Sequence, residues 1–209
     1  MRKLVVFDVD GTLNRTDIVS VPAHLKALKK RGITNVTEEQ IRSTFGERAE
    51  EFVKILLGEV TPSEARAYLD DLSQYERELM PILGRPFDGV TETLRRLKED
   101  GYRIATCSNS SLRYQTTVLN TLHLSAYVDT IQDLRPGMTK VETLALLLEK
   151  EKPDAAIMVG DRIFDIEAGR KNGLKTIGCR YGYSPLEAEK ADYVVNHAAA
   201  IYQIVKKAI

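Results

Sequence analysis

Two carboxylates separated by a single residue follow a short apolar run near the beginning of the chain. Asp8 and Asp10 come directly after residues 4–7, which are Leu, Val, Val and Phe, and a Gly-Thr pair follows them. An apolar run of this kind, stopped by a turn, is typical of a buried strand. In an open α/β sheet, ligands bind at the carboxyl ends of the strands. We therefore interpret one carboxylate as a candidate for nucleophilic attack or metal binding, and the other as a candidate for proton transfer to a leaving group.

Two other roles are known for acids in such a position. A single Asp most often caps a strand in solvent. A calcium-binding loop also contains Asp-x-Asp and a Gly, but Gly11 comes two positions too early for such a loop. Val19 occupies the position of its bidentate Glu. The spacing therefore disfavours a calcium loop.

The elements that would position the pair fall into two groups. Start and stop signals predict helices at about 22–30, 37–46, 47–57 and 61–80. Farther along, strands at 102–107, 127–131, 155–159, 176–179 and 193–195 alternate with helices, which indicates a parallel sheet with helices on both faces. We predict an α/β, Rossmann-like core of residues 1–13 and 87–209, with a small all-helical cap domain, residues 14–86, inserted after the first strand.

Composition narrows the classes of function. The chain has 209 residues, 43% of them hydrophobic, and 30 basic residues balance 30 acidic ones. This balance argues against a nucleic-acid partner or an anionic membrane surface. Cys107 and Cys179 lie in apolar runs without metal-ligand spacing, and no apolar run approaches the roughly 20 residues of a membrane span. We expect a cytoplasmic protein, monomer or weak homodimer, that binds neither nucleic acid nor membrane.

A second candidate site follows the strand predicted at 102–107. Ser108 and Asn109 come after this strand and before a helix, so hydroxyl groups and free backbone N–H groups collect at a helix N-terminus. Such an arrangement can hold phosphate. A plain helix cap is the alternative, because Ser and Asn are preferred cap residues.

The third candidate is Lys140. Thr139 and Glu142 form a capping box, which places Lys140 in the first turn of a helix. A cation there opposes the helix dipole by about 0.3–1 kcal/mol, which a bound anion would compensate. The alternative is an exposed lysine without a role.

The fourth candidate again ends an apolar strand. Gly160 and Asp161 follow the strand predicted at 155–159, and Asp165 comes four residues after Asp161. Side chains one helical turn apart share a face, so both carboxylates can reach one cleft. For Asp165 the alternative is an acid favoured by the helix dipole.

Together these stretches resemble the motifs of one family, the haloacid dehalogenase-like superfamily of phosphohydrolases. Asp8-Val9-Asp10-Gly11-Thr12 resembles its first motif, and Ser108, Lys140 and Gly160-Asp161-x-x-x-Asp165 resemble the other three in order. Val141 departs from the Pro that often follows the third-motif Lys. The sequences around Asp88-Gly89-Val90 and at 180–183 are similar to those of the phosphoglycolate phosphatase and β-phosphoglucomutase-like subgroup, which carries a helical cap.

The resemblance implies that the strand before Asp8 lies between the strands before Ser108 and Gly160, and it implies a role for each matching residue. Asp8 would attack phosphorus and form an aspartyl phosphate, while Asp10 would protonate the leaving group and then activate water. Magnesium would be held by Asp8, the Asp10 backbone carbonyl and Asp161, with Asp165 acting through water or by orienting Lys140. The transferring phosphoryl group would contact Ser108, Asn109 and Lys140, and Thr12 would support the Asp10 loop.

The resemblance also implies a substrate class. An acid at the position of Asp10 favours phosphate esters over haloacids or phosphonates. We expect a magnesium-dependent phosphatase acting on a small phosphomonoester, phosphoglycolate-like or a sugar phosphate, although residues 14–16 depart from the Val-Asp-Ser of many relatives. Arg48 in the cap and Arg15 at the hinge are candidates for binding a substrate carboxylate, or are solvated surface residues. A β-phosphoglucomutase-like phosphotransferase, a 5′-nucleotidase and a catalytically silent binding protein are the alternatives.

Overall fold

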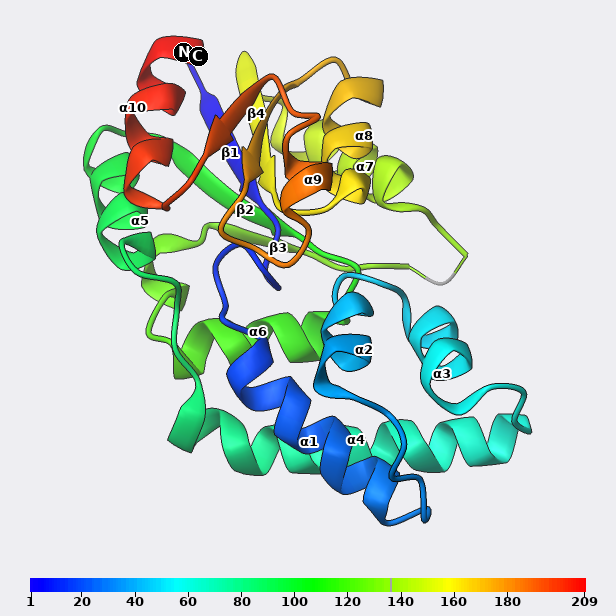
Figure 1. Cartoon of the computed structure of the whole chain (residues 1–209). Coiled ribbons are helices and arrows are strands. Elements are labelled where there is room, and N and C mark those ends of the chain that lie inside the picture. Colours follow the sequence, from blue (N-terminus) through cyan, green and yellow to red (C-terminus); the bar gives the residue numbers. More distant parts are fainter. Residues whose placement is uncertain (136) are drawn as a thin grey trace.

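A six-stranded parallel sheet forms the centre of the computed structural model, which describes residues 1–135 and 137–209 (Figure 1). In spatial order the strands are β3, β2, β1, β4, β5 and β6. Their bounds are β1 Lys3–Phe7, β2 Arg103–Cys107, β3 Thr130–Gln132, β4 Ala155–Gly160, β5 Lys175–Cys179 and β6 Tyr193–Val195. The predicted α/β, Rossmann-like core is confirmed.

The strand register brings the candidate motifs to one edge of the sheet. Phe7, the last residue of β1, pairs with Thr106 of β2 on one side and with Val159 of β4 on the other. The polar residues that follow these three strands therefore emerge at the same level. β1 lies between β2 and β4, as the resemblance implied.

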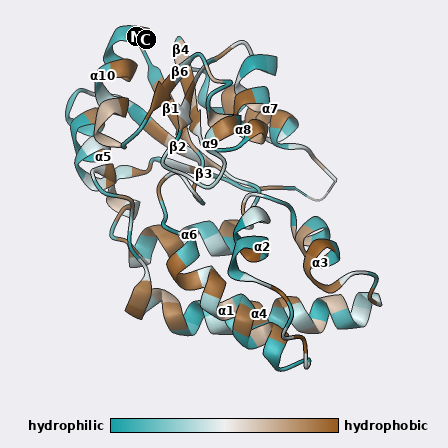
Figure 2. Cartoon of the chain, in the orientation of Figure 1, coloured by the Kyte–Doolittle hydropathy of each residue, from teal (hydrophilic) through white to brown (hydrophobic). Residues whose placement is uncertain are grey.

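Helices cover both faces of the sheet. Successive side chains of each strand point to opposite faces, so both faces carry apolar residues that the helices bury. Val5 and Phe7 of β1 belong to an apolar cluster with α5 (Val90–Glu99), α6 (Leu112–Thr121) and α10 (Ala199–Ala208). Leu4 and Val6 belong to a second cluster with α7 (Lys140–Glu151) and α8 (Ile163–Lys171). Figure 2 shows the corresponding apolar colouring of the strands and its alternation along the helices. The short α9 (Pro185–Ala188) lies beside β5.

Four helices between β1 and α5 form a separate apolar cluster, and we call them the cap. They are α1 (Asp17–Lys29), α2 (Glu38–Ser43), α3 (Ala49–Leu57) and α4 (Pro62–Leu83). α1 packs along α4, and the fully buried Tyr68 lies in their cluster. Figure 1 shows the cap below the end of the sheet at which β1 stops. The domain boundaries at 13/14 and 86/87 stay a prediction.

The predicted starts of two elements differ most from the structure. The first cap helix begins at Asp17 and contains Pro22, whereas the sequence predicted a start at Pro22. The helix continues through Pro22, although proline lacks the N–H group for a hydrogen bond inside a helix. The strand predicted at 127–131 begins instead at Thr130, because residues 125–127 form a 3-10 helix before the chain joins β2.

No helix in the described part of the chain combines the length and the apolar character that crossing a membrane requires. Cys107 and Cys179 are both buried as free thiols.

Candidate active site

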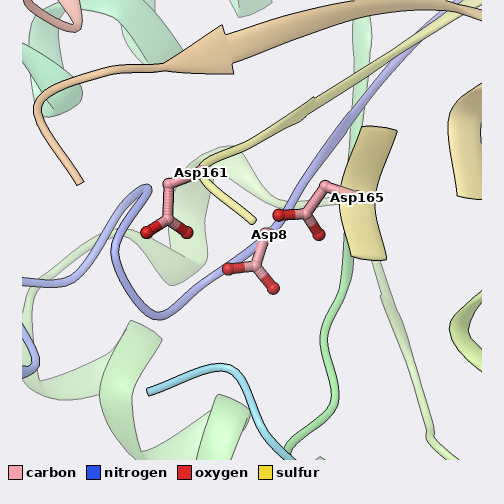
Figure 3. Close-up of side chains that lie close together, drawn as sticks. All are labelled: Asp8, Asp161 and Asp165. Atoms are coloured by element: carbon pink, nitrogen blue, oxygen red, sulfur yellow. The ribbon is translucent and has the colours of Figure 1, made fainter. Parts of the chain in front are cut away.

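Three buried carboxylates meet at the carboxyl end of the sheet. Asp8 follows β1, Asp161 follows β4, and Asp165 lies in the first turn of α8. Each offers one oxygen within 4.8 Å of the other two (Figure 3). Their exposed fractions are 5%, 0% and 1% respectively. Three carboxylates that lie after β1, after β4 and in α8 therefore form one acidic cluster.

Burial of this cluster opposes ionisation of its members. Burial first, and then the Asp165 and Asp10 charges, raise the pKa of Asp8 to about 7, although Lys140 lowers it. The pKa of Asp161 lies well above its ordinary value, because of burial first and then because of the nearby Asp8 and Asp165 charges. Groups of like charge in a desolvated site need a compensating cation to be ionised together.

Lys140 supplies one such cation. Its Nζ lies 2.6 Å from Asp8 Oδ1 and 2.5 Å from Asp165 Oδ1. Lys140 is the first residue of α7, where the capping box of Thr139 and Glu142 fixes the helix start. Burial lowers the pKa of Lys140, but the Asp165 and Asp8 carboxylates outweigh burial and raise it above its usual range. The helix therefore begins with a buried ammonium group between two acids.

The cluster fits a divalent metal ion. Asp161 Oδ2 accepts a hydrogen bond of 2.8 Å from the Tyr183 N–H, whereas Asp161 Oδ1 is buried and lacks a partner among the described residues. A Cβ atom on Gly11, which has φ +88°, would lie 2.3 Å from Asp161 Oδ2. Because Gly11 has no side chain, the space beside it is free for the Asp161 carboxylate. Hard cations prefer such carboxylate oxygens, and three acids with one lysine leave a net negative charge to be neutralised.

Asp10 is held by a different set of groups. Its Oδ1 accepts hydrogen bonds from Thr16 Oγ1 at 2.6 Å, from Tyr114 Oη at 2.8 Å and from Asn14 Nδ2 at 3.2 Å. Burial raises the pKa of Asp10, and these hydrogen bonds oppose that shift. Its side chain is not part of the three-carboxylate cluster, so it is available for proton transfer. The sequence did not single out Tyr114 or Asn14.

The predicted phosphate-binding residues also converge on this edge. Ser108 Oγ lies 2.9 Å from Ser110 Oγ, and Asn109 Nδ2 donates a hydrogen bond of 2.9 Å to the Gly46 carbonyl oxygen of the cap. Thr12 is fully buried, and its carbonyl oxygen accepts a hydrogen bond from Tyr181 Oη. Thr12 thus lies in the Asp10 loop but not on the surface of the cavity described next.

A cavity of about 260 Å³ lies between the core and the cap. Its core side includes Asp8, Asp10, Ser108 and Asn109. This volume is slightly below the ~300–1,000 Å³ of pockets for drug-sized ligands, so a small ligand suits it. The residues from the cap are Thr16, Ser20, His24, Thr44, Phe45, Gly46, Glu47, Ala49, Phe52, Leu72 and Glu76.

Arg48 lies outside that set of lining residues. Its Nη1 donates a hydrogen bond of 2.6 Å to the carbonyl oxygen of Met138. The role predicted for Arg48 in substrate binding stays a prediction, and in this structure the side chain instead joins the cap to the segment before α7.

Arg162 joins the core to the cap. The sequence indicated no role for this residue, which lies between Asp161 and Asp165. Its Nη2 lies 2.8 Å from Glu47 Oε1, and its Nη1 donates a hydrogen bond to the Phe45 carbonyl oxygen. Its Nε lies 2.9 Å from Glu187 Oε2 of α9. The cap segment that lines the cavity is therefore held by a largely buried guanidinium group.

We expect Arg162→Ala to raise KM roughly tenfold, because hydrogen bonds to charged groups are worth about 1.5–3 kcal/mol. The loss would leave Glu47 and the Phe45 carbonyl without their core partner. Steady-state kinetics with a small phosphate ester measure the effect. Arg170→Ala is the matched control, since Arg170 lies near the end of α8, is exposed and contacts Lys190 and Asp192. Equal KM values for both variants would contradict the role of Arg162.

His24 of α1 makes the cap sensitive to acid. It is 3% exposed, and its Nδ1 lies 2.5 Å from Tyr68 Oη. Burial lowers the pKa of His24 to about 4. Between that value and the ordinary value near 6.5, the unfolded chain binds a proton that the folded chain does not, so stability is lost as pH falls.

We therefore expect the difference in unfolding free energy between wild type and His24→Gln to change with pH. The wild type should lose about 3 kcal/mol more than the variant between pH 7 and pH 4, at 1.36 kcal/mol per pKa unit. Chemical denaturation at both pH values measures this difference. Because the acidic cluster is common to both proteins, its own titration cancels. A constant difference would show that His24 accepts a proton without cost to the fold.

Comparisons with known proteins agree with this arrangement. A family model described as haloacid dehalogenase-like hydrolase matches residues 5–179. The chain is 28% identical over 211 residues to a phosphoglycolate phosphatase of Aquifex aeolicus, with 97% of this chain and 96% of that protein covered. It is 26% identical over 222 residues to an N-acetylmuramic acid 6-phosphate phosphatase of Pseudomonas aeruginosa, with 99% and 96% covered.

The fold is similar to that in the crystal structure of a predicted phosphatase from Clostridium acetobutylicum. The TM-score is 0.87 at 22% identity, and 99% of each chain is covered. At this level of identity the likeness concerns the fold alone.

Proposed function

Because the chain belongs to the haloacid dehalogenase-like hydrolases and is a phosphatase, we propose that it hydrolyses a small phosphomonoester through an aspartyl phosphate on Asp8. One observation carries the proposal. Of the three clustered carboxylates, Asp8 is also a lining residue of the cavity. It can therefore meet both a metal ion and a substrate, as a nucleophile in this chemistry must.

The reaction that we propose has two steps. A carboxylate oxygen of Asp8 attacks phosphorus, the bond from phosphorus to the alcohol oxygen breaks, and protonated Asp10 gives its proton to that oxygen. Asp10 then takes a proton from water, which attacks the aspartyl phosphate and releases phosphate and free Asp8. The raised pKa of Asp10 suits this alternation between acid and base.

The remaining residues bind the transferring phosphoryl group. Ser108 and Asn109 line the cavity on its core side and would contact the phosphoryl oxygens. Lys140 would neutralise their charge while it holds Asp8 in place, at 2.6 Å. Thr12 would support the loop that carries Asp10. These groups are fixed before the substrate binds, so they can stabilise the negative charge that develops during phosphoryl transfer.

We propose Mg²⁺ as the metal ion. The ligands would be Asp8, the backbone carbonyl of Asp10 and Asp161, with Asp165 acting through water or through Lys140. The buried Asp161 Oδ1, which has no partner among the described residues, supports this assignment. When bound, Mg²⁺ would neutralise charge on the phosphoryl group. Carboxylate and carbonyl ligands suit a hard cation that retains several waters.

The physiological substrate is the finer part of the proposal. The two relatives described above act by name on different esters, phosphoglycolate and N-acetylmuramic acid 6-phosphate. Membership of the family therefore leaves both a phosphoglycolate-like ester and a sugar phosphate as candidates. We further propose that the protein acts in the cytoplasm as a monomer or weak homodimer.

Release of phosphate from a panel of phosphomonoesters, with Mg²⁺ and with a chelator, tests the proposal. We expect release that depends on Mg²⁺ and is lost with chelator. Product analysis with a sugar bisphosphate primer distinguishes a phosphotransferase, which would yield an isomeric sugar phosphate instead of free phosphate, and nucleoside monophosphates in the panel test the nucleotidase alternative. No release from any ester would contradict the proposed hydrolysis and favour a binding protein.

A further inference from the structure

The cap side of the cavity carries no cationic side chain among its described lining residues. His24 is the one titratable base in this set, and its low pKa keeps it neutral near pH 7. Glu47 is already paired with Arg162 at 2.8 Å. The charge that the cap presents to a substrate therefore comes from Glu76.

Glu76 lies on α4 and is half-buried at the wall of the cavity. Its Oε1 accepts a hydrogen bond of 2.7 Å from Ser20 Oγ of α1. Burial, and to a smaller extent the nearby Asp10 charge, raise the pKa of Glu76 to about 7, although the Ser20 hydrogen bond lowers it. The neighbouring cation, Arg77, instead donates a hydrogen bond to Ser73 Oγ at 2.6 Å. Glu76 and Ser20 thus form a hydrogen-bonding pair rather than an ion pair.

Apolar side chains form another part of this wall. Phe45, Phe52 and Leu72 line the same cavity from α2–α4 and their connections. A wall that combines a few hydrogen-bonding groups with aromatic and aliphatic surface suits a ligand with hydroxyl groups on one side and carbon on the other.

The arginines that could recognise a carboxylate lie elsewhere. Arg48 donates to the Met138 carbonyl oxygen, and Arg15 lies 3.9 Å from Asp17, outside the cavity lining. A carboxylate on the leaving group would lie in the cavity near Glu76 without a cationic partner. Burying such a charge unpaired is costly.

Resting on the proposed phosphatase function, we propose that the substrate is the phosphate ester of an uncharged, hydroxylated alcohol, such as a polyol or a sugar. Glu76 and Ser20 bind hydroxyl groups of the leaving group, and the Phe52 and Leu72 side chains pack against its carbon atoms. Esters whose leaving group carries a carboxylate, phosphoglycolate among them, are selected against.

Two matched esters test this specificity. Glycerol 3-phosphate and 3-phosphoglycerate differ in that a CH₂OH group replaces a carboxylate. We expect kcat/KM to favour glycerol 3-phosphate by at least about tenfold, because an unpaired carboxylate costs more than about 1.4 kcal/mol in such a site. Glu76→Gln keeps the size of the side chain and removes its charge. It should reduce the preference at least about threefold, whereas Glu78→Gln, on the exposed side of the same helix, should leave it unchanged.

The p-nitrophenyl ester of phosphate, which has no carboxylate, separates the specificity from the chemistry. Release from this ester together with equal or better use of 3-phosphoglycerate or phosphoglycolate would overturn the inference and leave the phosphatase function intact. A preference for phosphoethanolamine over glycerol 3-phosphate would also overturn it, since the site would then select a cation. An unchanged preference in Glu76→Gln would remove Glu76 from the explanation. No release from any ester would overturn the phosphatase function itself.

Discussion

Asp8→Asn is expected to lower kcat for phosphate release by at least about 10⁴-fold, since removal of a nucleophile abolishes the covalent route. Asp8 is the member of the acidic cluster that reaches the cavity. The amide that replaces it has nearly the same shape but is a poor nucleophile and a weaker metal ligand. Initial rates with saturating ester and Mg²⁺ measure the loss.

The fold should survive this change, because the amide oxygen can still accept the hydrogen bond from Lys140. Removing one of several buried like charges also relieves repulsion, so the unfolding free energy without metal should not fall. Asp88→Asn is the control, since Asp88 is exposed and is not part of the cluster. If a well-folded Asp8→Asn protein kept a tenth or more of the activity, the nucleophile would have to be another residue.

The local parts of the fold could be predicted from the sequence. Apolar runs and capping signals identified every strand of the sheet, because burial and helix ends leave a pattern within a few residues. The resemblance to haloacid dehalogenase-like hydrolases, which the family match confirms, also placed β1 between β2 and β4. The start of β3 was missed because pairing with β2, rather than hydrophobicity, decides where that short strand begins.

In the candidate site, too, only the residues with a local sequence signal could be predicted. Asp8, Ser108, Lys140 and Asp161 each stand at the end of a strand or the start of a helix, where their positions are readable in sequence. The groups that contact these residues could not be predicted from the sequence. Tyr114 is 104 residues from Asp10, with which it forms a hydrogen bond, and Arg162 is 117 residues from Phe45.

Glu76 was missed for a related reason. In sequence it is one of several acids in a long, charged helix, and its position on α4 shows no special signal. Only the packing of α1 on α4 brings Ser20 to it and turns both toward the cavity. Contacts of this kind depend on how the cap helices lie over the core, which local patterns do not specify.

Lys140→Met is expected to lower the unfolding free energy by about 3 kcal/mol and kcat by at least about a hundredfold. Lys140 lies within 2.6 Å of both Asp8 and Asp165, all three of them buried. Removing one partner of a buried ion pair leaves uncompensated charge and typically costs 3–5 kcal/mol. The loss should be greatest above pH 7, where the folded chain must either ionise Asp8 without its cation or hold a proton that the unfolded chain has released.

Denaturation with and without Mg²⁺ separates the two roles of this lysine. A bound divalent cation can replace the missing charge, so Mg²⁺ should stabilise Lys140→Met more than it stabilises the wild type. The same addition should leave kcat low, because the phosphoryl oxygens would still lack the ammonium group. Lys150→Met, at the exposed end of the same helix, should change neither quantity. A Lys140→Met protein with wild-type stability and activity would mean that Asp8 and Asp165 share a proton instead of a cation, which would remove the electrostatic basis of the proposed site.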